Sequence, residues 1–195
     1  MEARLVPRCK SMIEHLVFFL EEPSAEDFLK GLLPAILPIK ITPHFIVFEG
    51  KQDLEKQLTR RMRGWLRPNS RFIVMRDQDS GDCAVIKNRL IALCAEAGKP
   101  EAIVRIACRE LESFFVGDWQ AIADAFGKPS LAAHDRTAKY RIPDELGSPS
   151  VEIKKIIPDY QKRDGARRIT PHLRPERNRS NSFQVLYRTL CQAVD

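Results

Sequence analysis

Short apolar runs alternate with amphipathic segments along the first two thirds of the chain. An apolar run bounded by polar residues predicts a buried strand, and apolar residues at helical spacing predict a helix. The expected strands cover residues 15–20, 44–48, 72–75 and 102–107. Strands that alternate with helices predict an α/β fold, with a mainly parallel sheet joined by right-handed crossovers and flanked by helices.

Helices are expected between and after these strands. A capping box formed by Ser24 and Asp27 predicts the start of the first helix, and Gly98 predicts the end of the third. Later segments with helical spacing predict shorter helices over 117–126, 150–157 and 183–190, the second of them capped by Ser150.

The length and composition suit a single globular domain. A chain of 195 residues, 44% hydrophobic and 30% charged, can bury one well-packed core. We therefore expect an α/β core over 1–126 and, in the same domain, a basic C-terminal extension over 127–195 that packs on it. Five cysteines without metal-ligand spacing indicate reduced thiols, and no apolar segment is long enough for a signal sequence or a membrane span. We expect a cytoplasmic protein.

The candidate acidic residues follow the first, third and fourth predicted strands. Glu21 follows the first, Asp77 and Asp79 follow the third, and Glu110 and Glu112 follow the fourth. The carboxyl ends of parallel strands meet at one sheet edge, so these acids should converge, and two acids at i and i+2 in extended backbone point to the same side. A hard cation with oxygen ligands, Mg²⁺ or Mn²⁺, would relieve their mutual repulsion.

A simpler interpretation of these acids stays open. Asp79 or Asp82 can cap the following helix while Asp77 forms an Asx turn. Of Glu110 and Glu112, the helical repeat lets only one face the site, and we expect Glu110 because it lies nearer the strand end.

Basic residues are concentrated near the C-terminus. Residues 154–179 contain nine Lys and Arg against three acids, an excess equal to the formal charge of +6 of the whole chain. Such a patch can neutralise phosphates and so bind nucleic acid, although a solvated basic tail remains the alternative. The expected nucleic-acid contacts are Lys154, Lys155, Lys162, Arg167, Arg168, His172 and Arg179.

The acidic motifs resemble those of known proteins. Glu21 after one strand and Asp77-x-Asp79 after another resemble the Toprim pattern of topoisomerases, primases and the overcoming-lysogenization-defect nucleases. An ordered set of motifs along nearly the whole chain is similar to the bacterial domain-of-unknown-function family 4276. These motifs lie at 21–24, 48–51, 76–83, 109–112, 117–118, 165–168 and 178–183.

The resemblance implies a Toprim-like sheet with a magnesium site. By motif position, Glu21 would be the general base or acid, and Asp77 and Asp79 would be the metal ligands. Glu110 and Glu112 would lie beside them. The resemblance also implies an ATPase partner encoded nearby in a defence-like locus.

Three functions are compatible with these features. The first is a metal-dependent phosphoryl-transfer enzyme, a nuclease, which needs a partner for any ATP-driven step because the chain has no GxxxxGK[ST] motif. The second is a non-catalytic subunit that binds metal or nucleotide and docks an ATPase. It is kept because Glu22 stands where the Toprim pattern has glycine, which lets a phosphate approach the backbone. The third is a nucleotide hydrolase, which would not need the extended basic patch. An oligomer is compatible with all three.

Overall fold

A four-stranded parallel sheet in the order β2-β1-β3-β4 lies at the centre of the protein. The computed structural model describes residues 13–194. Its strands are β1 (His15–Leu20), β2 (Thr42–Val47), β3 (Ser70–Asp77) and β4 (Ile103–Ala107). Leu20 pairs with Val47 on one side and with Met75 on the other, so the carboxyl ends of the central strands lie level. The predicted α/β architecture with a parallel sheet is confirmed.

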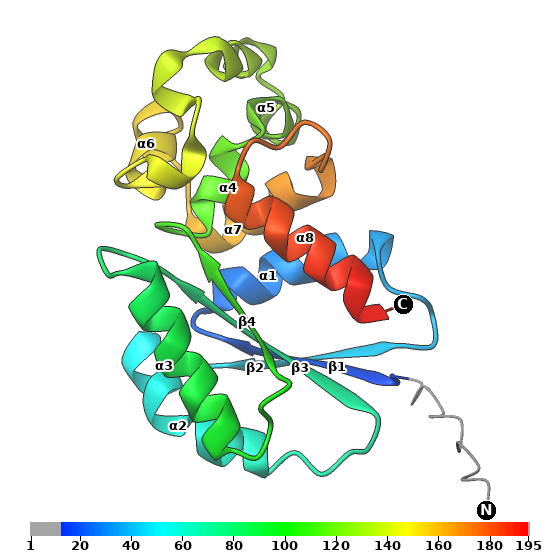
Figure 1. Cartoon of the computed structure of the whole chain (residues 1–195). Helices are drawn as coiled ribbons and strands as arrows, with labels where there is room; N and C mark the ends of the chain where they lie inside the picture. The colour runs from blue at the N-terminus through cyan, green and yellow to red at the C-terminus, as the bar shows by residue number, and fades with distance from the viewer. Residues whose placement is uncertain (1–12, 195) are drawn as a thin grey trace, which may run out of the picture.

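Three crossover helices cover both faces of this sheet. They are α1 (Pro23–Leu32), α2 (Lys51–Arg63) and α3 (Cys83–Glu96). Helix α1 lies on one face, and α2 and α3 lie on the other (Figure 1). The connections from β1 and β3 therefore leave in opposite directions, which places the topological switch point between the carboxyl ends of these two strands. Open α/β sheets bind their ligands in the crevice at such a point.

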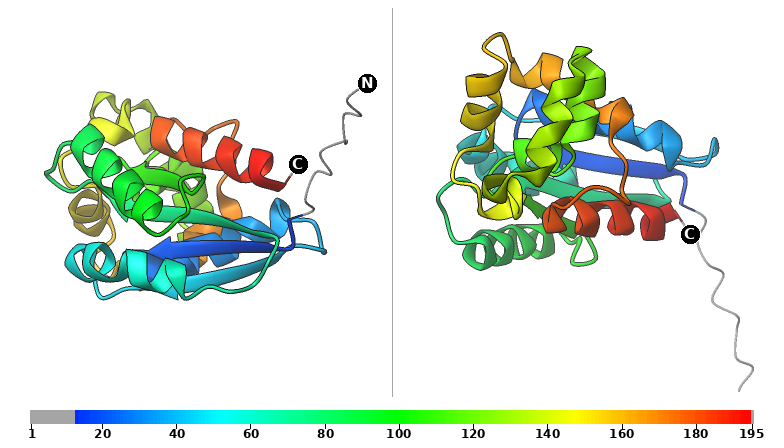
Figure 2. Two further views of the ribbon diagram at one scale, coloured as in Figure 1. Left: turned by 60° about the horizontal axis from the view of Figure 1, so that its bottom comes forward. Right: turned by 90° about the horizontal axis from the view of Figure 1, so that it is seen from above.

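The chain after β4 is almost entirely helical. Its helices are α4 (Glu112–Val116), α5 (Trp119–Phe126), α6 (Pro149–Ile156), α7 (Lys162–Ile169) and α8 (Asn181–Val194). Short 3-10 segments lie at Leu33–Ala35, Pro129–Arg136, Ala138–Tyr140, Pro143–Glu145 and Thr170–His172. Helices α4 to α7 gather on the α1 side of the sheet, and α8 returns beside α1 (Figures 1 and 2). Within residues 13–194, no helix has both the length and the apolarity to cross a membrane.

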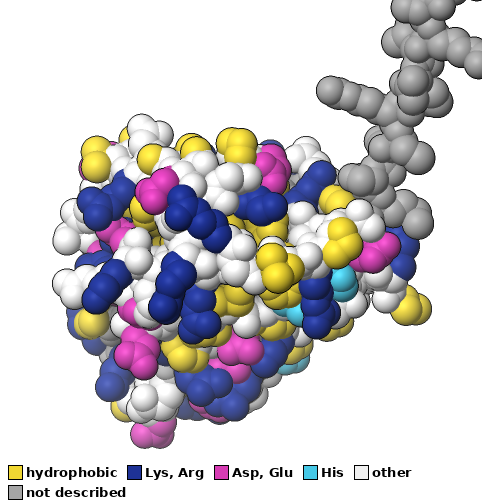
Figure 3. All heavy atoms as spheres, turned by 90° about the horizontal axis from the view of Figure 1, so that it is seen from below, with side chains coloured by type: hydrophobic (Ala, Val, Ile, Leu, Met, Phe, Trp, Pro, Cys, Tyr) yellow, Lys and Arg dark blue, Asp and Glu magenta, His cyan; other side chains and the backbone are white. Residues whose placement is uncertain are grey.

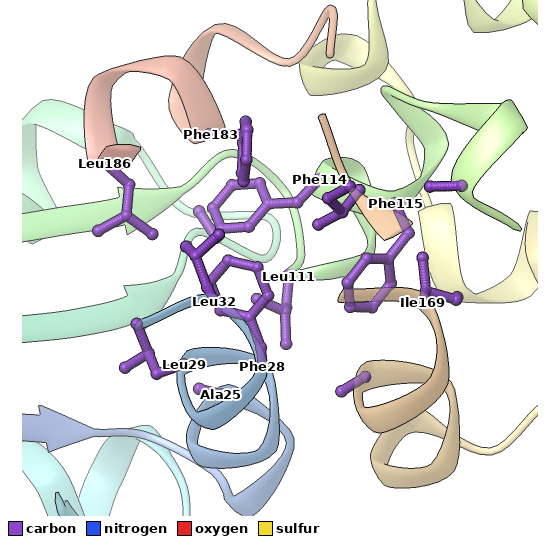
Figure 4. Packing of buried hydrophobic residues seen from close by; sticks show 14 of the residues in the cluster. Ala25, Phe28, Leu29, Leu32, Leu111, Phe114, Phe115, Ile169, Phe183 and Leu186 are labelled. Atoms are coloured by element: carbon purple, nitrogen blue, oxygen red, sulfur yellow. The ribbon is translucent and has the colours of Figure 1, made fainter. Parts of the chain in front are cut away.

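An aromatic core joins the two halves of the chain. The ring of Phe28 on α1 lies 5.4 Å from that of Phe114, 6.2 Å from that of Phe115 and 6.4 Å from that of Phe183 (Figure 4). Burying one such side chain stabilises the fold by roughly 1.5–3 kcal/mol. Because its partners lie on α4 and α8, the C-terminal half shares one core with α1.

The opposite face of the sheet has its own apolar cluster. On α2, Leu54, Leu58 and Met62 are fully buried, as their spacing predicts. Lys56 and Arg60 of α2 are exposed. Figure 3 shows that Lys and Arg side chains on this side of the molecule are mixed with acids and apolar groups. The outer side of α2 is therefore a solvated surface of mixed charge.

Two predicted helix caps are wrong. Helix α1 begins at Pro23, so Ser24 lies inside its first turn, while Asp27 accepts a hydrogen bond from Arg163 Nε at 2.6 Å. Helix α6 begins at Pro149 after Ser148, and not at a capping Ser150. In both cases proline occupies the first helical position, which its fixed φ favours, so the helix begins before the predicted cap.

Candidate acidic site at the carboxyl edge of the sheet

Glu21 and Asp77 lie on the two sides of the switch point. The backbone N–H of Asp77 donates to Glu21 Oε2 at 3.1 Å, which holds Glu21 across the gap between β1 and β3. The Asp77 carboxylate is only 8% exposed and makes no hydrogen bond among residues 13–194. Burial, followed by the charges of Glu22 and Glu112, raises the pKa of Asp77 well above its usual value. Burial also raises the pKa of Glu21.

Glu112, at the start of α4, is fully buried. Its Oε1 accepts a hydrogen bond from the Tyr160 hydroxyl at 3.1 Å. Its Oε2 has no hydrogen-bond partner among the described residues and lies 3.9 Å from Lys162 Nζ. Burial raises the pKa of Glu112 to about 7, although Lys162 opposes the shift. A buried oxygen without a donor costs about 1–3 kcal/mol, so this oxygen is a candidate ligand atom.

The expectation that Glu110, and not Glu112, faces Asp77 is wrong. Glu110 Oε2 accepts the backbone N–H of Ser150 at 2.8 Å, whereas the charge of Glu112 acts directly on Asp77. The argument from the helical repeat does not apply, because α4 begins at Glu112 and Glu110 precedes it. Arg109, with a φ of +66°, turns the chain just before.

Asp79 is separated from Asp77. Strand β3 ends at Asp77, and Asp79 has a φ of +55°, so the alternation that would place both carboxylates on one side has already stopped. Asp79 Oδ2 lies 2.7 Å from Lys51 Nζ, at the start of α2. The expected joint binding of one cation by Asp77 and Asp79 is thus not arranged in this structure. Asp82 accepts the N–H of Val85 at 2.9 Å and caps α3, as the simpler interpretation predicts.

Arg76 connects Glu21 to α2. Its guanidinium is paired with Glu55, which also lies 2.6 Å from Arg89 Nε. Arg76 Nε lies 3.7 Å from Glu21 Oε2 and has no hydrogen-bond partner among residues 13–194. The Asp77 N–H and a buried guanidinium therefore both lie close to Oε2 of Glu21.

Three members of the site were not predicted as such: Glu22, Tyr160 and Lys162. Lys162 Nζ, expected to contact nucleic acid, lies 3.5 Å from Glu22 Oε1 and close to Glu112. Tyr160 packs so closely on Gly165 that a Cβ there would overlap the ring, which explains the glycine of the 165–168 motif. The one sequence signal was Glu22 itself, as a departure from the Toprim glycine. We call Glu21, Glu22, Asp77 and Glu112 the acidic site.

The basic residues expected to bind nucleic acid do not form one free surface. Besides Lys162, three have acidic partners: Lys155 with Glu152 at 2.8 Å, Arg168 with Asp164 at 3.5 Å, and Arg179 with Asp135 at 2.7 Å. Within residues 13–194, no ion pair involves Lys154, Arg167 or His172. Of the residues expected to contact phosphates, Lys154, Arg167 and His172 are therefore the ones without an acidic partner among the described residues.

The chemistry of the acidic site fits a hard cation. Within the described residues, no group of three or more His, Cys, Asp or Glu side chains is already arranged to hold a metal ion. The donors are nevertheless all carboxylate oxygens, the ligands that Mg²⁺ and Mn²⁺ prefer. Glu112 Oε2 is buried without a hydrogen-bond donor among the described residues, as a metal ligand would be before the ion enters.

A parallel α/β sheet with buried acids at its switch point defines the class of this protein. The model of the family described as "Domain of unknown function (DUF4276)" matches residues 20–191, and the chain belongs to that family, which confirms the resemblance. The match includes every residue of the acidic site. No curated protein and no solved structure matches the chain significantly.

Proposed function

We propose that the protein is a Mg²⁺-dependent phosphoryl-transfer enzyme, a Toprim-like nuclease that acts with an ATPase partner in a defence-like system. One observation carries the proposal: Asp77, buried near the switch point of the sheet, lies close enough to Glu21 and Glu112 for their charges to add to the effect of burial in raising its pKa, and Glu112 Oε2 is buried without a hydrogen-bond donor among the described residues. Buried like charges destabilise a fold unless a cation compensates them.

The residues of the site suit the parts of such a reaction. Asp77 and Glu21 would hold the ion, which when bound stabilises charge on a phosphate and lowers the pKa of a water. Glu21, oriented by the Asp77 N–H and by Arg76, can accept or donate a proton there. Lys154, Arg167 and His172 would contact the phosphates of the strand. We place the protein in the cytoplasm because the four cysteines within residues 13–194 are free; Cys9 lies outside the described residues.

The test is Mg²⁺- or Mn²⁺-dependent degradation of plasmid DNA, single-stranded DNA and RNA. Asp77→Asn should reduce turnover by about 100-fold or more, because it removes a ligand charge. It should melt no lower than wild type in EDTA, since it also relieves repulsion. The matched control is Asp159→Asn, which changes an exposed acid and should cut like wild type. Equal cutting by wild type and Asp77→Asn would indicate a contaminating nuclease and remove the assignment.

A second candidate is a non-catalytic subunit that docks an ATPase. It is favoured by Glu22 and Lys162, which place two side chains where the Toprim pattern leaves room for a phosphate. In that case no nucleic acid would be hydrolysed even with the ATPase present, the protein alone would hydrolyse no nucleotide, and Asp77→Asn would leave partner binding unchanged. Hydrolysis of nucleoside triphosphates alone would instead support a nucleotide hydrolase.

A further inference from the structure

The acidic site contains a cation supplied by the chain itself. Lys162 Nζ lies 3.5 Å from Glu22 Oε1 and 3.9 Å from Glu112 Oε2. A lysine amine has an ordinary pKa of about 10.4, so this side chain is charged at neutral pH. An ammonium ion therefore lies among carboxylates that would otherwise repel one another.

The acidic site has two halves with different partners. In the first half, Glu21 is held by the Asp77 N–H, and the carboxylate of Asp77 makes no hydrogen bond among residues 13–194. In the second half, Lys162 lies between Glu22 and Glu112. In the first half, Arg76 approaches Glu21 Oε2 at 3.7 Å but pairs with Glu55, and the Asp77 carboxylate is left for an added ion. The second half already has Lys162 between its two carboxylates.

We propose that Lys162 is a fixed internal cation occupying the Glu22–Glu112 half of the acidic site, so that the site takes one divalent metal ion, at Glu21 and Asp77, and not two. The inference rests on the proposed metal-dependent function and specifies how many ions that function uses. One ammonium and one divalent ion bring three positive charges to four carboxylates. A second divalent ion would have to displace Lys162.

The position of Lys162 is determined by how α7 is anchored. The next residue, Arg163, donates to both carboxylate oxygens of Asp27 on α1, at 2.6 and 3.4 Å. Ala166 and Ile169 of the same helix are fully buried. The backbone of α7 is therefore held against α1, and only the side chain of Lys162 is free to leave the site.

The unpartnered oxygen of Glu112 is an independent indication that this half binds cations. Oε2 is fully buried and has no hydrogen-bond donor among residues 13–194, and the nearest positive group, Lys162, lies beyond hydrogen-bond distance. An ion pair at that distance compensates the charge but leaves a ligand position unfilled. Removing the ammonium ion should thus convert this half into a second metal position.

The test counts Mn²⁺ ions bound to the full-length protein, by electron paramagnetic resonance and isothermal titration, with metal raised to millimolar concentrations. Wild type should bind one ion, and Lys162→Met should bind two. Lys162→Arg keeps the charge and should bind one. The matched control is Lys154→Met, which removes an exposed lysine with no ion pair among residues 13–194 and should also bind one.

The outcomes separate this inference from the proposed function. If wild type binds two ions, or if Lys162→Met still binds one with unchanged affinity, the internal-cation role is overturned while a metal-dependent function stands. If wild type binds none, the proposed function itself fails, and this inference with it. Should Lys162→Met fail to fold, the double variant Lys162→Met with Glu22→Gln removes both charges together and should bind one ion. Two ions in that variant would contradict the assignment of Glu22 as the partner of Lys162.

Discussion

Glu112 and Asp118 are both fully buried acids in one short stretch of the chain, but their surroundings are opposite. Asp118 accepts hydrogen bonds from the backbone N–H groups of Ala121 at 3.2 Å and Arg174 at 3.0 Å, and from Arg177 at 3.1 and 3.2 Å. Glu112 has one donor, Tyr160, and one oxygen without any among the described residues. The Asp118 carboxylate has its full set of donors and connects parts of the structure, whereas the Glu112 carboxylate has an oxygen that remains a candidate ligand atom.

The same contrast divides the motifs of the family. Gly117 lies against Asn178, whose side chain donates to Phe114 O at 2.7 Å, so the 117–118 and 178–183 motifs tie α4 and α5 to α8. The motifs at 21–24, 76–83 and 109–112 instead supply the acidic site. In this chain, therefore, some of these motifs hold the helices after β4 together, and others form a candidate reaction centre.

The largest expected effect is the loss of stability on replacing Asp118, the buried acid that has its full set of donors. Asp118→Ala removes the N-cap of α5 and leaves Arg177 without its carboxylate, and should lower the free energy of unfolding by about 3 kcal/mol. Chemical denaturation measures it. Asp124→Ala, on the exposed side of the same helix, should change stability by less than about 0.5 kcal/mol. Equal effects of the two substitutions would remove the distinction between Asp118 and an ordinary surface acid.

A smaller loss of stability is expected at Gly165. A methyl group there overlaps the ring of Tyr160, so Gly165→Ala should cost about 1–3 kcal/mol and disturb the hydrogen bond to Glu112. Gly147→Ala is the control, because its Cβ would meet no atom within 4 Å. Denaturation of both variants in EDTA tests the prediction, which fails if Gly165→Ala is as stable as the control.

The stability of the metal-free protein should depend on pH through the ionisation of Glu112. Its pKa is raised from 4.5 to about 7, so the folded state keeps a proton that the unfolded state has lost. Stability should therefore fall as the pH rises from 4.5 towards 7 and level off above that. Glu112→Gln removes the contribution, so melting curves in EDTA at pH 5 and pH 8 should differ less for the variant. An unchanged difference would show that Glu112 is not the group responsible.

The smallest effect concerns the free basic residues. Replacing Lys154 and Arg167 with Gln should weaken nucleic-acid binding regardless of sequence and reduce the slope of log affinity against log salt by about 2 for duplex DNA. Salt titrations of binding measure this slope. Arg136→Gln, which removes an exposed arginine outside the basic segment, should leave it unchanged. If both variants bind alike, Lys154 and Arg167 are part of a solvated or partner-binding surface.

The sequence by itself determined the edge of the sheet at which the candidate site lies. Apolar runs alternating with amphipathic segments can be satisfied only by strands and crossover helices, and parallel strands end at one edge. The approach of Glu21 to Asp77 followed from this alternation, because Glu21 directly follows β1 and Asp77 is the last residue of β3.

Only the tertiary structure decided which other groups join them. Asp79 pairs with Lys51 beyond the end of β3, where its backbone adopts a left-handed conformation. Glu112 takes the place expected of Glu110 because the chain turns at Arg109 before α4 begins. Lys162 reaches the acids through the docking of α7 on α1, a contact between segments more than a hundred residues apart. Such contacts depend on how buried surfaces fit together, and local patterns along a chain carry no record of that fit.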